Sequence, residues 1–143
     1  MVRRALVLAL GIGLAAGITA AGHDEKHESV KLLAARDIAE KIDGKTAKAT
    51  TVEVTFKPGE TEASHRHPGP AFGYVLEGEY EWAIDDNPAK VLKVGDTFYE
   101  PTGCLHRVSR NASKTSKTRI LAVVLHPADV KDIVIPEKDK KEE

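Results

Sequence analysis

The 143-residue sequence predicts one all-β domain, an antiparallel jelly roll built from short strands. Three observations support this prediction. Short β-branched segments alternate polar and apolar residues with a period of two. Turn-forming residues such as Gly, Pro, Asn and Asp separate these segments at short intervals. The chain is also long enough, with 41% hydrophobic residues, to bury one core.

Residues 1–21 are predicted to be a secretory signal peptide and not part of the fold. A basic Arg3-Arg4 pair precedes the uncharged apolar stretch 5–20, and small residues at 19–21 are followed by a charged run. The apolar stretch is short for a membrane span, which needs about 20 residues. Cleavage is therefore favoured over an uncleaved anchor, and the mature protein is expected to be periplasmic or secreted, without a stable membrane span.

The remaining chain is expected to comprise a flexible leader at 22–29, a β-barrel domain at 30–136 and a charged, disordered tail at 137–143. One segment favours a helix. Ile38 and Ile42 are spaced i, i+4, which predicts a short N-terminal helical turn over 36–42 that ends at Asp43-Gly44.

The strands are predicted in order along the barrel domain. The stretch 72–84 is a long β run with interior glycines at 73 and 78, which suggest a bulge or a close backbone approach. The stretch 119–126 is apolar between its terminal Arg119 and His126 and predicts a strand buried on both faces. The other expected strands are 30–33, 51–56, 64–67, 90–94, 97–100 and 106–109, with one more edge piece within 130–135.

Three histidines form the candidate metal site. His65 and His67 are separated by two positions, so they project from the same face of a strand. His106 begins another predicted strand and could converge on them. Three neutral imidazoles directed at one point are ligands for a first-row transition metal. The single cysteine excludes an internal disulfide framework and a multi-cysteine zinc site.

The spacing around these histidines resembles the two motifs of the cupin superfamily. Gly59, His65, His67 and Gly78 fall in register with the first motif, which also contains a metal-binding glutamate, and Gly95, Pro101, Gly103 and His106 fall in register with the second. The resemblance covers about residues 50–126. It implies a small, single-domain cupin of the conserved-barrel type, with a jelly-roll fold and a metal bound inside the barrel.

The chain departs from the family pattern at the glutamate, because that position is occupied by Ala71. The expected site is therefore three histidines alone, which frees a coordination position for substrate or dioxygen. Glu100 is a candidate replacement and a candidate catalytic residue, although a solvent-facing strand end is the favoured interpretation for it because Gly95 can shift the strand parity. Glu62 and Glu77 also lie near the motif and receive little weight.

The aromatic residues have two open interpretations, since they could line a substrate pocket or simply form the core. Tyr74 is a second candidate catalytic residue because it lies on a motif strand. The other aromatic residues considered for the pocket are Phe72, Tyr80, Trp82 and Phe98.

The function expected from this resemblance is that of an exported, metal-binding, dioxygenase-like oxidoreductase. His65, His67 and His106 would hold Fe(II), with Zn, Mn, Ni or Cu as alternative ions, and a small diketone, thiol or phenolic substrate would chelate it. The alternative is a non-catalytic periplasmic cupin that binds a small molecule or a metal. The net charge of -1 argues against a nucleic-acid partner, and the apolar strand 120–125 permits a homodimer.

Overall fold

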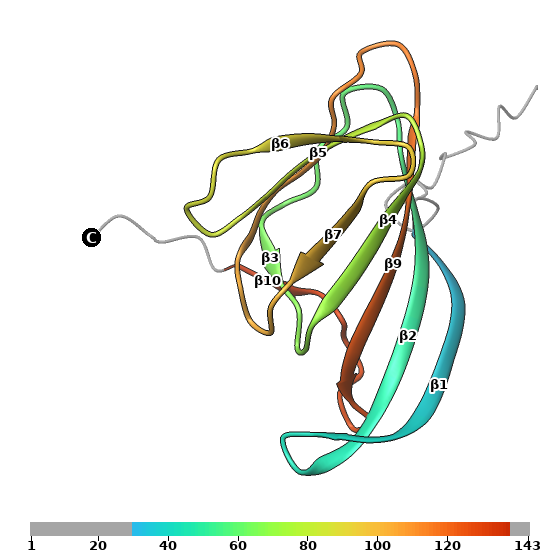
Figure 1. Ribbon diagram of the computed structural model, residues 1–143, viewed down its shortest axis with the longest axis vertical. Coiled ribbons are helices and arrows are strands. Elements are labelled where there is room, and N and C mark those ends of the chain that lie inside the picture. The colour runs from blue at the N-terminus through green and yellow to red at the C-terminus, as the bar shows by residue number, and fades with distance from the viewer. Residues whose placement is uncertain (1–29, 138–143) are drawn as a thin grey trace, which may run out of the picture.

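The computed structural model describes residues 30–137, which form two five-stranded antiparallel sheets packed against each other (Figure 1). The strand orders are β1-β2-β9-β4-β7 and β10-β3-β8-β5-β6. This arrangement confirms the predicted all-β jelly roll. The strands are β1 (Val30–Ile42), β2 (Lys45–Phe56), β3 (His65–Arg66), β4 (Ala71–Glu77), β5 (Glu79–Ile84), β6 (Lys90–Lys93), β7 (Thr97–Glu100), β8 (His106–Asn111), β9 (Thr118–Pro127) and β10 (Ile135–Pro136).

The helical turn predicted over 36–42 is wrong, because these residues form the second half of β1. They pair with β2, and Ile38 lies opposite Ala47. A spacing of four residues places Ile38 and Ile42 on one face of a strand as well as on one face of a helix, so the spacing cannot separate the two. The turn between β1 and β2 favours the strand over the helix. Asp43 and Gly44 both have positive φ values, 51° and 75°, as a two-residue hairpin turn requires.

The predicted β run over 72–84 divides at Gly78 into two strands that belong to different sheets. Gly78 has a φ of 78°, and the β4–β9 register slips between Val75 and Glu77. A Cβ atom at Gly78 would lie 2.4 Å from the carbonyl oxygen of Lys117. Gly78 is therefore the residue at which the chain passes from the first sheet to the second.

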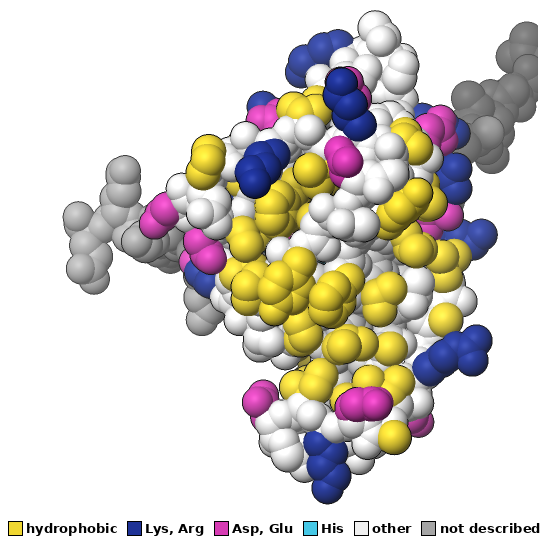
Figure 2. All heavy atoms as spheres, in the orientation of Figure 1, with side chains coloured by type: hydrophobic (Ala, Val, Ile, Leu, Met, Phe, Trp, Pro, Cys, Tyr) yellow, Lys and Arg dark blue, Asp and Glu magenta, His cyan; other side chains and the backbone are white. Residues whose placement is uncertain are grey.

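The core lies between the sheets and is formed by Phe56, Val75, Tyr80, Phe98 and Ile120. The outer face of the first sheet is less well covered. Phe72 and Tyr99 are about half exposed there, with ring centroids 5.2 Å apart. Figure 2 shows hydrophobic side chains gathered over the face that carries β4, β7 and β9 in Figure 1. The outward side chains of β9 are only half-buried, so the prediction that this strand is buried on both faces is wrong for its outer face.

Residues 1–29 and 138–143 lie outside the described residues, and with them the predicted signal peptide, leader and most of the tail. Within residues 30–137, no helix has the length and hydrophobicity needed to cross a membrane.

Candidate metal centre

The pairing of β3 with β8 brings the three predicted histidines together. His65 lies directly opposite His106 in the ladder, and His67 follows immediately after β3. The ring centroid of His65 is 4.9 Å from that of His67 and 4.9 Å from that of His106. One ligand nitrogen from each ring lies within 4.8 Å of the other two. The two sequence motifs therefore meet at one point inside the barrel, as the sequence predicts.

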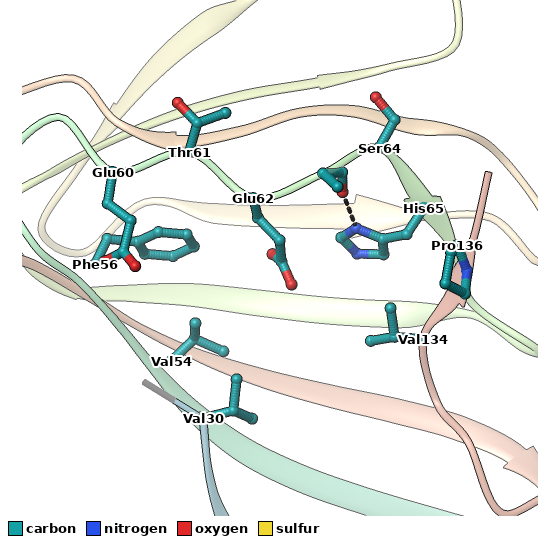
Figure 3. A pocket seen from close by; sticks show the side chains of 11 residues that line it. Val30, Val54, Phe56, Glu60, Thr61, Glu62, Ser64, His65, Val134 and Pro136 are labelled. Atoms are coloured by element: carbon teal, nitrogen blue, oxygen red, sulfur yellow. Dashed lines mark hydrogen bonds between the residues drawn. The ribbon is translucent and has the colours of Figure 1, made fainter. Parts of the chain in front are cut away.

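Backbone carbonyls fix the orientation of two of these rings. His65 Nδ1 lies 2.9 Å from the oxygen of Ala63, a contact drawn in Figure 3, and His67 Nδ1 lies 2.6 Å from the oxygen of Ile133. A carbonyl oxygen only accepts, so each Nδ1 donates its proton. In a neutral imidazole, Nε2 is then the nitrogen with a free lone pair for a metal.

Glu100 points into the site, so the solvent-facing interpretation favoured from the sequence is wrong. It is only 1% exposed, and it lies directly opposite Ala71 in the β4–β7 ladder. Its Oε1 atom is 3.2 Å from His106 Nδ1, and its Oε2 atom is 3.4 Å from His67 Nε2. Gly95 precedes β7 and does not interrupt the alternation within the strand, which turns Phe98 and Glu100 inward. A buried carboxylate on the neighbouring strand therefore lies beside the position at which β4 carries Ala71.

The structure does not bring Tyr74 to this site. Along β4 the inward positions are Ala71, Gly73 and Val75, whereas Tyr74 lies on the outer face and is 42% exposed. It lines neither of the cavities described below. Strand alternation therefore places the ring of Tyr74 on the face of β4 opposite to the histidines.

The electrostatics of the site favour neutral imidazoles and a cation. Burial lowers the pKa of His106 to about 3, with a further lowering from His65 and His67. Burial also lowers the pKa of His67 and raises the pKa of Glu100. A carboxylate that is desolvated in this way is stabilised by a nearby positive charge.

Two buried atoms have no hydrogen-bond partner among the described residues, and both face this site. They are Glu100 Oε2 and His106 Nδ1. Two donors that bind one ion at about 2.1 Å, with an angle between 90° and 109°, are about 3.0–3.4 Å apart, so nitrogens separated by up to 4.8 Å would have to approach each other by about 1.4 Å or more around a metal. The residues therefore fit a divalent transition metal, which would satisfy both atoms.

The site opens into a small cavity of about 100 Å³. Its walls combine the three histidines and Glu100 with apolar side chains from the first sheet. A larger groove of about 540 Å³, drawn in Figure 3, adjoins it. His65 and Glu62 line both spaces. Neither space has a Lys or Arg among the described residues that line it.

Three aromatic residues considered from the sequence do lie at the site. Tyr80 and Phe98 line the small cavity, and Trp82 Nε1 donates a 3.0 Å hydrogen bond to Glu100 Oε1. Ser109, which was not among the predicted site residues, hydrogen-bonds both Tyr80 and Glu62. A serine on a β-strand has no sequence signature of its own, so only the fold could identify it.

Comparison with known proteins agrees with this architecture. The model of the Cupin domain family matches residues 52–124. The DMSP lyase DddQ from Ruegeria pomeroyi DSS-3 aligns with a TM-score of 0.53 and 20% identity over 66% of this chain and 45% of that chain. An uncharacterized double-stranded β-helix protein from Klebsiella pneumoniae aligns with a TM-score of 0.50 and 23% identity over 62% of this chain and 76% of that chain. The chain thus spans less than half of the lyase's length, and the likeness shows the fold alone. No curated protein matches the chain.

Proposed function

The chain belongs to the cupin family, and from this premise we propose that it is an exported, mononuclear non-haem metal oxidoreductase. Its substrate would be a small chelating molecule bound beside the metal. One observation carries the proposal. Three imidazoles and a buried carboxylate converge beside a cavity of about 100 Å³, with two ligand-type atoms left without hydrogen-bond partners among the described residues.

We assign Glu100 as the fourth ligand, beside His65, His67 and His106. Two donors that bind one ion at about 2.1 Å, with an angle between 90° and 109°, are about 3.0–3.4 Å apart. The distance of 3.4 Å between Glu100 Oε2 and His67 Nε2 matches this separation. The hydrogen bond from Trp82 to Oε1 orients the carboxylate and leaves Oε2 free. A set of three imidazoles and one carboxylate suits Fe(II), and also Mn, Ni, Cu or Zn.

Glu100→Gln is expected to weaken metal binding while stabilising the metal-free protein. Burial raises the pKa of Glu100 in the folded, metal-free protein. The free energy of unfolding of that protein therefore falls as pH rises above the ordinary carboxyl pKa, because the buried carboxyl group must ionise. The neutral glutamine amide avoids this loss of stability. It also lacks the negative charge that stabilises a bound cation. Chemical unfolding at pH 5 and pH 8, with and without Zn²⁺, measures both effects. A variant that binds Zn²⁺ as tightly as the wild type would contradict the ligand assignment.

The cavity sets limits on the substrate. It is small and largely apolar, and no Lys or Arg lines it within the described chain, so no cation is placed to hold a free carboxylate. A neutral diketone, thiol or phenol that chelates through its own oxygen or sulfur atoms fits better. When bound, Fe(II) would supply a redox-active Lewis acid at which substrate and dioxygen meet. Val52, Phe98 and Val124 give the cavity an apolar wall, and His65, His67, His106 and Glu100 would hold the metal.

The proposal predicts that Fe(II)-loaded protein consumes one dioxygen per substrate molecule with at least one diketone, thiol or catechol. An oxygen electrode measures uptake, and product analysis with ¹⁸O₂ shows whether both atoms enter the product. Tyr74→Phe is a matched control that should keep full activity, because Tyr74 lies on the outer face. Tight ligand binding without oxygen uptake across the whole panel would contradict the oxidoreductase and favour the non-catalytic binding module.

A further inference from the structure

A line of hydrogen-bonded side chains connects the large groove to His106. Glu62 Oε2 lies 3.0 Å from Ser109 Oγ, and Ser109 Oγ lies 2.9 Å from Tyr80 Oη. Tyr80 Oη in turn lies 3.3 Å from His106 Nε2. Tyr80 and Ser109 are 0% and 2% exposed, whereas Glu62 is half-buried and points into the groove (Figure 3). The line therefore begins at the groove and ends on a metal ligand.

The carboxylate fixes the direction of every hydrogen bond in this line. An ionised carboxylate only accepts, so the single proton of the Ser109 hydroxyl is donated to Glu62. Ser109 Oγ must then accept the proton of Tyr80, since each hydroxyl has one proton to give. Tyr80 Oη is left as the acceptor for His106, and Nε2 must therefore carry the imidazole proton.

We propose that Glu62, acting through Ser109 and Tyr80, is a positioning residue that holds His106 as its Nε2–H tautomer, so that His106 binds the metal through Nδ1. This inference rests on the metal site proposed above. His65 and His67 take the opposite arrangement, because their Nδ1 protons are donated to backbone carbonyls and Nε2 is free.

The surroundings of His106 Nδ1 agree with this role. Nδ1 is the buried ring nitrogen that has no hydrogen-bond partner, and it lies 3.2 Å from Glu100 Oε1. The nitrogen that the line of hydrogen bonds leaves unprotonated is thus the one that faces the carboxylate and the other two imidazoles. Outer partners of this kind fix the tautomer and ring orientation of a metal-binding histidine.

The tautomers can be observed directly in the Zn²⁺-loaded full-length protein. Long-range ¹H–¹⁵N correlation NMR distinguishes the protonated ring nitrogen of each histidine from the metal-bound one. We expect Nδ1–H for His65 and His67, and Nε2–H with a zinc-bound Nδ1 for His106. If His106 shows Nδ1–H with a zinc-bound Nε2, the inference is overturned while the metal site stands. If the wild-type protein binds no Zn²⁺, the proposed function itself fails.

Three substitutions test whether the line acts as a unit. Tyr80→Phe, Ser109→Ala and Glu62→Ala should each weaken Zn²⁺ binding by about 10–100-fold, the usual effect of removing an outer partner. In each variant the Nε2–H signal of His106 should exchange faster or shift, a change that a merely structural role would not produce. Thermal unfolding of the metal-free variants identifies any that fail to fold.

Glu60→Ala is the matched control. Glu60 lines the same groove, but its carboxylate accepts a 2.6 Å hydrogen bond from the backbone nitrogen of Lys57 and is not part of the line. It should leave both the Zn²⁺ affinity and the His106 signal unchanged. Equal effects of Glu60→Ala and Glu62→Ala would overturn the assignment, because they would indicate a general effect of groove charge. A Glu62→Ala variant whose Zn²⁺ affinity and His106 signal are both unchanged would also overturn the assignment.

Discussion

Replacing His106 with alanine is expected to abolish metal binding by the folded protein. His106 contributes one of three converging imidazoles and lies 3.2 Å from Glu100, so its loss removes a ligand and leaves the buried carboxylate without its neighbour. Loss of an outer partner already costs about 10–100-fold in affinity, and loss of a ligand should cost more. Metal content after dialysis, measured by mass spectrometry, should fall from about one ion per chain to near zero.

His126→Gln provides the comparison for His106→Ala. His126 is also buried, at 2% exposure, but it lies on β9 and its Nε2 atom is 2.8 Å from the hydroxyl of Thr50. This substitution should cost about 1–3 kcal/mol of stability through the disturbed hydrogen bond and should leave metal content unchanged. Equal metal content in His106→Ala and the wild type would rule out the three-histidine site.

Gly73→Ala is expected to produce a large loss of stability. A Cβ atom at residue 73 would lie 1.8 Å from Cζ of Phe98, which is opposite it in the β4–β7 ladder. The Phe98 ring cannot move freely, because its centroid lies 5.5 Å from that of Tyr80 and 5.8 Å from that of Trp82. Overpacking of this kind costs about 2–3 kcal/mol, which urea unfolding would measure.

The displaced ring would also disturb the metal centre, since Trp82 hydrogen-bonds Glu100 and Tyr80 contacts His106. Gly103→Ala is a useful control. A Cβ atom there would meet no atom within 4 Å, so only its positive φ of 73° costs stability, by about 1 kcal/mol. If Gly73→Ala were no more destabilising than Gly103→Ala, the tight contact with Phe98 would be refuted.

The sequence predicted most of the strands because alternation and turn chemistry are local properties. The prediction from sequence was wrong where one local pattern is compatible with two different structures. The spacing of Ile38 and Ile42 fits both a helix and a strand, and only the pairing of β1 with β2 resolves it. It also missed the division at Gly78, since a glycine inside a β run does not show whether the chain bulges or changes sheets.

For the site, the sequence by itself determined the fold class and the three histidines, because the His65–His67 spacing and the two motifs are encoded in the order of residues. The tertiary structure alone decided which other groups face them. Glu100 lies in the site and Tyr74 outside it because the inward face of β7 and the outward face of β4 are fixed by register between strands. The approach of Glu62 and Tyr80 to Ser109 depends on contacts between residues up to 47 positions apart, which no local pattern specifies.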